Sequence, residues 1–160
     1  MTVKAQPDGY HSVTPYIITH DAAGAIEFYK KAFGATELMR LPGPGGKVMH
    51  AEIKIGDSPV MLADEFPEMG IKSAKTIGGS PIHLMIYTDD CDAMFAQAIA
   101  AGAAEKKPMA DQFYGDRSGS VEDPYGHEWT IATHIEDLTP EVVDQRFQEM
   151  MQQGGGDGES

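Results

Sequence analysis

The sequence predicts an α+β fold of two tandem β-α-β-β-β modules followed by a C-terminal helix. The first observation is that strand-like segments and helix-like segments recur in the same order over residues 13–65 and 81–134. The second is a local match between T-H-D-A-A-G-A (19–25) and T-D-D-C-D-A-M (88–94), at the same place in both segments. Together they indicate an internal duplication.

The first module begins with a strand over 13–19, which is β-branched and aromatic, after an irregular polar segment over 1–12. Asp21 is placed to cap a helix whose apolar residues follow the rhythm of one buried face, and Gly34 is placed to end it. Three further strands are then expected, separated by turns rich in Gly, Pro, Asp and Ser; they span 36–41, 47–55 and 59–64.

The second module follows a connecting segment, 65–79, that contains Pro and Gly and has no clear period, so we expect a long loop. Asp89 and Asp90 are placed to cap a helix that ends at Gly102. The predicted strands of this module span 81–88, 103–108, 111–121 and 127–133, with a turn at 123–126.

The C-terminal part is expected to form a helix over 135–152 and a disordered tail over 153–160. Pro140 fits the first helical position, with Thr139 as its cap. The helix carries apolar side chains that could pack on the domain or on a second chain. The Gly-rich tail has no side chains with which to build a core.

Charge and hydropathy argue against several classes of protein. The chain has 25 acidic and 12 basic residues, a formal net charge of −13, and no basic stripe or aromatic RNA-binding motif, so no nucleic-acid partner is expected. No stretch approaches the roughly 18 apolar residues of a membrane span, and the N-terminus lacks a secretory signal. The single cysteine, Cys91, cannot form an internal disulfide. We therefore expect a cytoplasmic protein with no membrane partner.

Three segments resemble the vicinal oxygen chelate superfamily, which includes glyoxalase I, extradiol dioxygenases and the fosfomycin- and bleomycin-resistance proteins. A-I-E-F-Y-K-K-A-F-G-A (25–35) resembles its first-helix signature, and G-D-S-P-V-M-L-A-D-E (56–65) the end of its first module. Q-F-Y-G-D-R-S-G-S-V-E-D-P-Y-G-H-E-W-T-I-A-T-H (112–134) is similar to the end of the second module in the PhnB-like glyoxalase branch. The resemblance implies two modules over 13–134 that form a cupped mixed sheet.

In metal-dependent members of that superfamily, the first and last strands of each module supply one ligand each, commonly His, Gln or Glu. The resemblance places these positions at Thr14 and Leu62 in the first module and at His83 and Thr130 in the second. Only His83 is a strong donor, and a shift of one residue from Leu62 to Met61 does no better. We therefore expect no cofactor, while a divalent metal held by other ligands stays an alternative.

Alternation along the last strand divides its side chains between two faces. Glu128, Thr130 and His134 share one face, and Trp129 and Ile131 share the other. The apolar pair is expected to face the helices, which leaves Glu128, Thr130 and His134 toward the cup or its rim. The alternative is that Glu128 and His134 are solvated polar residues at the ends of a strand.

Two other strands offer candidate site residues. His50 and Glu52 are two positions apart in K-V-M-H-A-E-I-K-I (47–55) and therefore point the same way, and His83 shares a face with Tyr87. If both strands line the cup, His50 and Glu52 could reach His83 across it. Otherwise His83 is a hydrogen-bonded cavity histidine and Glu52 lies on a wet surface.

Aromatic and cationic side chains complete the ligand-binding candidates. Arg117 is one of few cations, and a guanidinium in a pocket would bind a carboxylate or phosphonate through two contacts. The alternative is an Asp116–Arg117 pair that stabilises a hairpin. Tyr114 of the same segment and Tyr16 of the first strand are the remaining candidates.

Two active functions follow from the resemblance and these residues. The first is metal-independent binding of a small organic ligand in the cup between modules, as in bleomycin resistance. The second is a lyase or isomerase of glyoxalase type, with or without a metal, in which His83 and either Glu52 or Glu128 carry out acid–base chemistry. An interaction protein with a vestigial cup is a third reading. Pairing of modules between chains, sealed by the C-terminal helix, predicts a homodimer.

Overall fold

The structure is a computed structural model that describes residues 2–154. Its elements, in chain order, are β1 (Tyr16–Thr19), α1 (Ala22–Phe33), β2 (Thr36–Pro42), η1 (Pro44–Gly46), β3 (Val48–Ile55), β4 (Ser58–Asp64), η2 (Pro67–Met69), α2 (Ala74–Ile77), β5 (His83–Tyr87), α3 (Cys91–Ala101), β6 (Ala104–Asp111), β7 (Asp116–Glu122), β8 (Glu128–His134) and α4 (Pro140–Gly154). Of the expected tail over 153–160, the first two residues belong to α4, and the rest lie outside the described residues.

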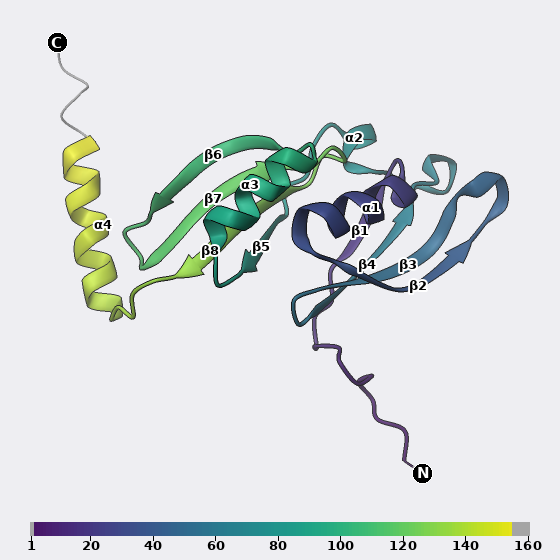
Figure 1. Cartoon of the computed structure of the whole chain (residues 1–160), viewed down its shortest axis with the longest axis horizontal. Helices are drawn as coiled ribbons and strands as arrows, with labels where there is room; N and C mark the ends of the chain where they lie inside the picture. The colour runs from purple at the N-terminus through teal and green to yellow at the C-terminus, as the bar shows by residue number, and fades with distance from the viewer. Residues whose placement is uncertain (1, 155–160) are drawn as a thin grey trace.

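The strands form two four-stranded mixed sheets with the same connectivity, which confirms the two tandem modules. The first sheet has the order β1-β4-β3-β2 and the second the order β5-β8-β7-β6. In each sheet the first and last strands of the module are parallel neighbours, and the other pairs are antiparallel. Figure 1 shows the two sheets side by side, with α1 and α3 covering the same side of them.

The two principal helices begin and end where their capping residues predict. Asp21 accepts a hydrogen bond from the backbone N–H of Gly24 at 3.0 Å, and Asp90 does the same for Ala93 at 3.0 Å. Gly34 ends α1 in the left-handed region at φ 67°, a conformation that glycine adopts without a steric penalty. These local signals suffice to fix both helices.

Three expectations about the elements need correction. The predicted loop over 65–79 contains η2 and the short helix α2, whose N-cap is Ser73. The strand expected from residue 111 starts only at 116, because residues 112–115 form a turn closed by the Gln112 N–H and the Asp116 carbonyl at 2.7 Å. The segment assigned to the C-terminal helix from 135 is helical only from Pro140, the residue expected at its first position, because the amides of residues 135 and 136 both donate to the carbonyl of Gly115.

The two modules share one hydrophobic core through their helical layers. α1 packs against α3, and the indole of Trp129 on β8 lies 4.8 Å from the ring of Phe33 and 5.3 Å from that of Tyr29. The buried carboxylate of Asp123 accepts hydrogen bonds from the Tyr29 hydroxyl at 2.5 Å and from the Trp129 indole at 2.8 Å. A side chain of α1 is thereby fixed to the turn before β8.

This arrangement leaves one face of each sheet without a covering helix. We call these the first open face, which carries Tyr16, His50, Glu52 and Met61, and the second open face, which carries His83, Met85, Tyr87, Asp116, Ser120, Glu128, Thr130 and His134. None of the helices within residues 2–154 is long and apolar enough to cross a membrane.

Candidate functional site

The first open face brings together His50, Glu52 and Tyr16, as their alternation predicts. The Tyr16 hydroxyl lies 2.8 Å from His50 Nδ1, and His50 Nε2 lies 3.2 Å from a Glu52 carboxylate oxygen. His50 thereby joins the Tyr16 hydroxyl to the Glu52 carboxylate through its two ring nitrogens. Tyr10 adds a hydrogen bond to the other oxygen of Glu52, from the segment expected to be irregular.

The hydrogen bonds of this cluster favour an ionised Glu52. The bond from Tyr10, followed by that from His50, lowers the pKa of Glu52. The same bond raises the pKa of Tyr10, and burial raises the pKa of Tyr16. The first open face therefore presents a carboxylate and two protonated phenols around the imidazole of His50, a set able to exchange hydrogen bonds with a polar ligand.

The second open face pairs His83 with Glu128. The two residues are directly opposite in the parallel register of β5 and β8, and His83 Nε2 lies 3.4 Å from a Glu128 carboxylate oxygen. Along the same face, the hydroxyls of Ser120 and Thr130 are hydrogen-bonded at 3.0 Å. Of the two partners considered for His83, the structure places Glu128 beside it, whereas Glu52 contacts Tyr10 and His50.

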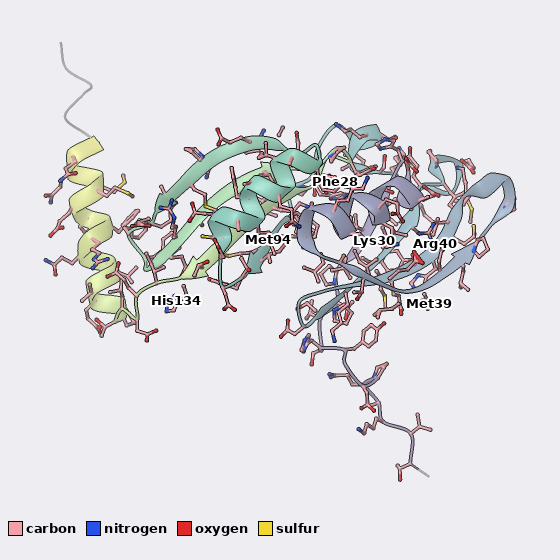
Figure 2. All side chains as sticks on the ribbon, viewed as in Figure 1. Phe28, Lys30, Met39, Arg40, Met94 and His134 are labelled. Atoms are coloured by element: carbon pink, nitrogen blue, oxygen red, sulfur yellow. The ribbon has the colours of Figure 1, made fainter. Side chains whose placement is uncertain are left out.

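A second polar cluster lies at the far end of this face, where β8 meets the linker to α4 (Figure 2). The carboxylate of Asp116, 4% exposed, accepts from the Tyr87 hydroxyl at 2.8 Å and contacts His134 Nδ1 at 2.8 Å. The other nitrogen of His134 lies 2.8 Å from Asp137. An imidazole between two carboxylates must carry both protons. Asp116, and then Asp137, raise the pKa of His134, and Asp116 raises that of Tyr87.

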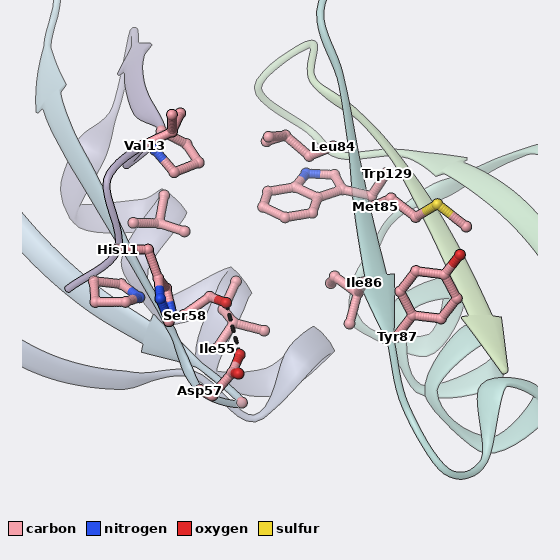
Figure 3. Close-up of a pocket in the computed structure, with 14 residues that line it drawn as sticks. His11, Val13, Ile55, Asp57, Ser58, Leu84, Met85, Ile86, Tyr87 and Trp129 are labelled. Carbon is pink, nitrogen blue, oxygen red and sulfur yellow. Dashed lines mark hydrogen bonds between the residues drawn. The ribbon is translucent and has the colours of Figure 1, made fainter. Parts of the chain in front are cut away.

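The structure does not bring the two open faces across a common cavity within one chain. Tyr16 is 50% exposed and Tyr87 61% exposed, although both were expected in a cup between modules. One cavity between the modules has a volume of about 630 Å³ (Figure 3) and is bordered by the β3–β4 hairpin, residues 11–15, β5 and Trp129. A second, of about 270 Å³, is bordered by Tyr16, Leu84 and His127. Among the predicted site residues, only Tyr87 borders the larger cavity.

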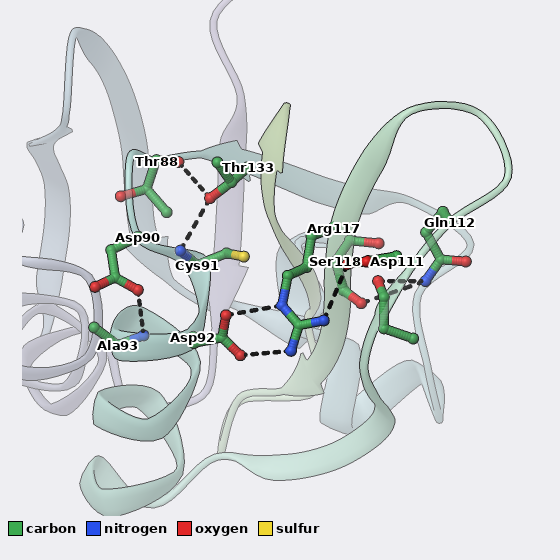
Figure 4. Close-up of polar contacts among 11 residues, drawn as sticks. Thr88, Asp90, Cys91, Asp92, Ala93, Asp111, Gln112, Arg117, Ser118 and Thr133 are labelled. Carbon is green, nitrogen blue, oxygen red and sulfur yellow. Dashed lines mark hydrogen bonds and ion pairs between the residues drawn. The ribbon is translucent and has the colours of Figure 1, made fainter. Parts of the chain in front are cut away.

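Arg117 lies away from the open faces, on the side of β7 that faces α3. Its guanidinium makes a two-point contact with Asp92 at 2.8 and 2.9 Å and a third with Asp111 at 3.1 Å (Figure 4). The alternative Asp116–Arg117 pair does not form either, because neighbouring residues on a strand point to opposite faces. Tyr114, in the turn before β7, packs edge-on against Phe113 at 5.1 Å between ring centres.

The four positions at which relatives place metal ligands are also resolved. Leu62 is fully buried in the core, whereas its neighbour Met61 lies on the first open face. Thr14 precedes β1, and His83 and Thr130 lie on the second open face. Within residues 2–154, no three His, Cys, Asp or Glu side chains are grouped as a metal ion requires. Of the four positions, only His83 carries a strong donor, and it lies beside Glu128.

Sequence reasoning missed Asp116 and Asp123 as organising residues of these sites. Asp116 shares a face with His134 only through the antiparallel register of β7 and β8, which pairs the two residues. Asp123 was visible as the first residue of a D-P-Y-G turn, where an Asp side chain commonly bonds the following backbone. Its carboxylate accepts hydrogen bonds from the backbone N–H groups of Tyr125 and His127, at 2.9 and 3.0 Å, which fits that signal. Its bond to Tyr29 depends on the tertiary fold.

Comparison with known proteins identifies relatives over nearly the whole chain. An uncharacterized protein of Mycobacterium tuberculosis (strain H37Rv) is 39% identical over 159 residues, covering 98% of this chain and 89% of that protein. An uncharacterized protein of Arabidopsis thaliana is 31% identical over 128 residues, covering 74% of this chain and 76% of that protein.

Solved structures show the same fold. The crystal structure of TioX from Micromonospora sp. ML1 aligns with a TM-score of 0.62 at 25% identity, over 78% of this chain and 99% of that one. The X-ray structure of an Arabidopsis thaliana gene product aligns with a TM-score of 0.64 at 28% identity, over 77% and 98% of the two chains. The profile of the Glyoxalase/Bleomycin resistance protein/Dioxygenase superfamily matches residues 9–131. With both sheets in the expected strand order, the chain belongs to the glyoxalase/bleomycin resistance protein/dioxygenase superfamily.

Proposed function

We propose that the protein binds a small organic ligand between the first open face of one chain and the second open face of another. The observation that carries this proposal is that each open face has a His–Glu pair beside tyrosine or threonine hydroxyls, on a sheet side that no helix covers. Since neither of the two cavities between the modules is lined by residues of both open faces, a homodimer is the arrangement that encloses such a ligand.

The side chains around these pairs indicate the character of the ligand. Met39 and Leu41 of β2 are 37% and 50% exposed beside His50 and Glu52, and Met85 is 45% exposed beside Thr130. Methionine adapts to irregular apolar shapes, and such exposed apolar groups mark interaction surfaces. The ligand is therefore a partly apolar organic molecule with groups that hydrogen-bond to imidazole and carboxylate.

A second candidate function is a lyase or isomerase of glyoxalase type. The observation that favours it is the 3.4 Å contact between His83 and Glu128, in which the carboxylate can orient the imidazole for proton transfer. In this function His83 removes a proton from the bound molecule and returns it at another atom. Within the superfamily, we infer that the chain falls in the PhnB-like branch, on the basis of the segment 112–134.

A calorimetric screen of small organic molecules tests the binding function. A ligand that binds the unmodified protein should bind at least about tenfold more weakly to His50→Ala and to His83→Ala. Each change removes a hydrogen-bonding imidazole from one open face, and hydrogen bonds that involve a charged group contribute most. The matched control is His20→Ala, an exposed histidine outside both faces. Ligands whose affinity is unchanged in both variants would refute the proposal.

Two further measurements separate the alternatives. Sedimentation at micromolar concentration should give a dimer, and a monomer would remove the shared cup. Metal analysis of protein purified without chelator or His-tag tests whether ligand binding is metal-independent. A divalent metal found in near-stoichiometric amount would show that binding depends on a metal. If protons of the bound ligand exchange with deuterated water, and if this exchange is lost in Glu128→Gln, the isomerase function is favoured over ligand binding alone.

A further inference from the structure

We propose that the larger cavity between the two modules is a second ligand site, distinct from the open faces, that takes an organic amine with an apolar body. The cavity volume of about 630 Å³ lies within the range of about 300–1,000 Å³ typical of small-molecule sites. It lies at a junction between structural units, where such sites are common. The proposal does not depend on the function of the open faces.

The walls of this cavity are apolar and come from both modules. Ile55 and Val60 of the β3–β4 hairpin line one side, and Leu84, Ile86 and Trp129 of the second module line the other (Figure 3). The helix-facing side of this sheet carries Leu84, Ile86 and Trp129. The residues of the second open face alternate with them along β5 and β8 and therefore point to the opposite side. The cavity and the open face are therefore largely on different sides of β5 and β8, and they share an edge at Met85 and Tyr87.

The rim of the cavity carries an anionic group. Asp57, in the tight turn between β3 and β4, accepts a hydrogen bond from the Ser58 hydroxyl on one carboxylate oxygen at 2.7 Å. The other oxygen accepts none of the hydrogen bonds found within residues 2–154. The bond from Ser58 lowers the pKa of Asp57, and the basic side chains of His11, which also lines the cavity, and Lys54 act in the same direction, so the group is a carboxylate at neutral pH.

Charge complementarity selects the occupant. An ammonium at the rim can donate to the free oxygen of Asp57 while its apolar body contacts the indole and the aliphatic walls. The formal net charge of −13 also raises the local concentration of cations and lowers that of anions. A carboxylate ligand of the same shape would be repelled by Asp57 and is expected to bind more weakly than the amine.

The test uses Trp129, the single tryptophan of the chain, as the reporter. Fluorescence titrations compare phenylbutylamine, its neutral alcohol phenylbutanol and its anionic counterpart phenylbutanoate. We expect saturable changes in Trp129 emission, with the amine binding up to about fivefold more tightly than the alcohol, the range measured for exposed ion pairs. The advantage should shrink with added salt, and phenylbutanoate should bind most weakly.

Variants assign the effect to this cavity. Asp57→Asn should abolish the preference for the amine, whereas Glu68→Gln, an exposed acid outside the cavity, should keep it. Val13→Phe should weaken all three probes by filling the cavity, and its position, 84% exposed, tolerates the larger side chain. His83→Ala should leave the titrations unchanged, which separates this site from the open faces. No saturable response, equal binding of amine and alcohol, or a response that survives Val13→Phe would overturn the proposal.

Discussion

Tyr29→Phe is expected to destabilise the protein because it removes a hydrogen bond that joins the two modules. The Tyr29 hydroxyl donates at 2.5 Å to the buried carboxylate of Asp123, and Tyr29 is 0% exposed. A buried hydrogen bond to a charged group contributes about 1.5–3 kcal/mol to the free energy of unfolding. For a domain of this size each kcal/mol corresponds to roughly 2–4 °C in Tm, so the loss is about 3–12 °C.

Urea unfolding followed by Trp129 fluorescence measures this loss, since the same Asp123 accepts from the indole N–H at 2.8 Å. Tyr125→Phe is the matched control: Tyr125 is also buried in this aromatic cluster, and its hydroxyl makes no hydrogen bond within residues 2–154. The slope of the transition should be unchanged in both variants. If Tyr29→Phe lowered the free energy of unfolding no more than Tyr125→Phe, the hydrogen bond to Asp123 would not stabilise the contact between the modules.

Three further predictions follow from other parts of the structure. The carboxylates of Asp116 and then Asp137 raise the pKa of His134. Their contribution to the free energy of unfolding is therefore complete below the ordinary histidine pKa and is lost as the pH rises through the raised pKa of His134. The urea midpoint of the unmodified protein should therefore fall over that range, and that of His134→Gln should not. Gly115→Ala should cost about 1–3 kcal/mol in urea unfolding, because φ is +100° and the new Cβ would lie 2.6 Å from a linker carbonyl; an unchanged midpoint would contradict this. Cys91, 2% exposed, should react with a thiol reagent only on unfolding, and rapid labelling of the native protein would disprove its burial.

The sequence was informative where a single local interaction decides the structure. Asp21 and Asp90 cap their helices through bonds to residues three positions ahead, and Gly34 ends the first helix. The alternation along β8 placed Trp129 in the core and Glu128 on the open face, because successive side chains on a strand point to opposite sides. Local rules of this kind need no knowledge of the neighbouring strand.

The candidate site was less predictable because its contacts depend on register and on the packing of the modules. His83 meets Glu128 rather than Glu52, since β5 pairs with β8 and the first open face does not contact it. Leu62 is one residue out of phase with the open face, a shift that reverses the direction of the side chain. Arg117 faces α3 for the same reason.

The sequence by itself determined the two modules, their helices and the strand faces, because periodicity and capping are properties of short segments. Only the tertiary structure decided how the modules meet. They pack through α1 and α3, and Asp123 accepts hydrogen bonds from Tyr29 and Trp129 at this junction. This packing leaves both open faces uncovered. The cavity beside Asp57 and the Asp116–His134–Asp137 cluster depend on the same packing. They join residues far apart in the chain, and no local pattern encodes such contacts.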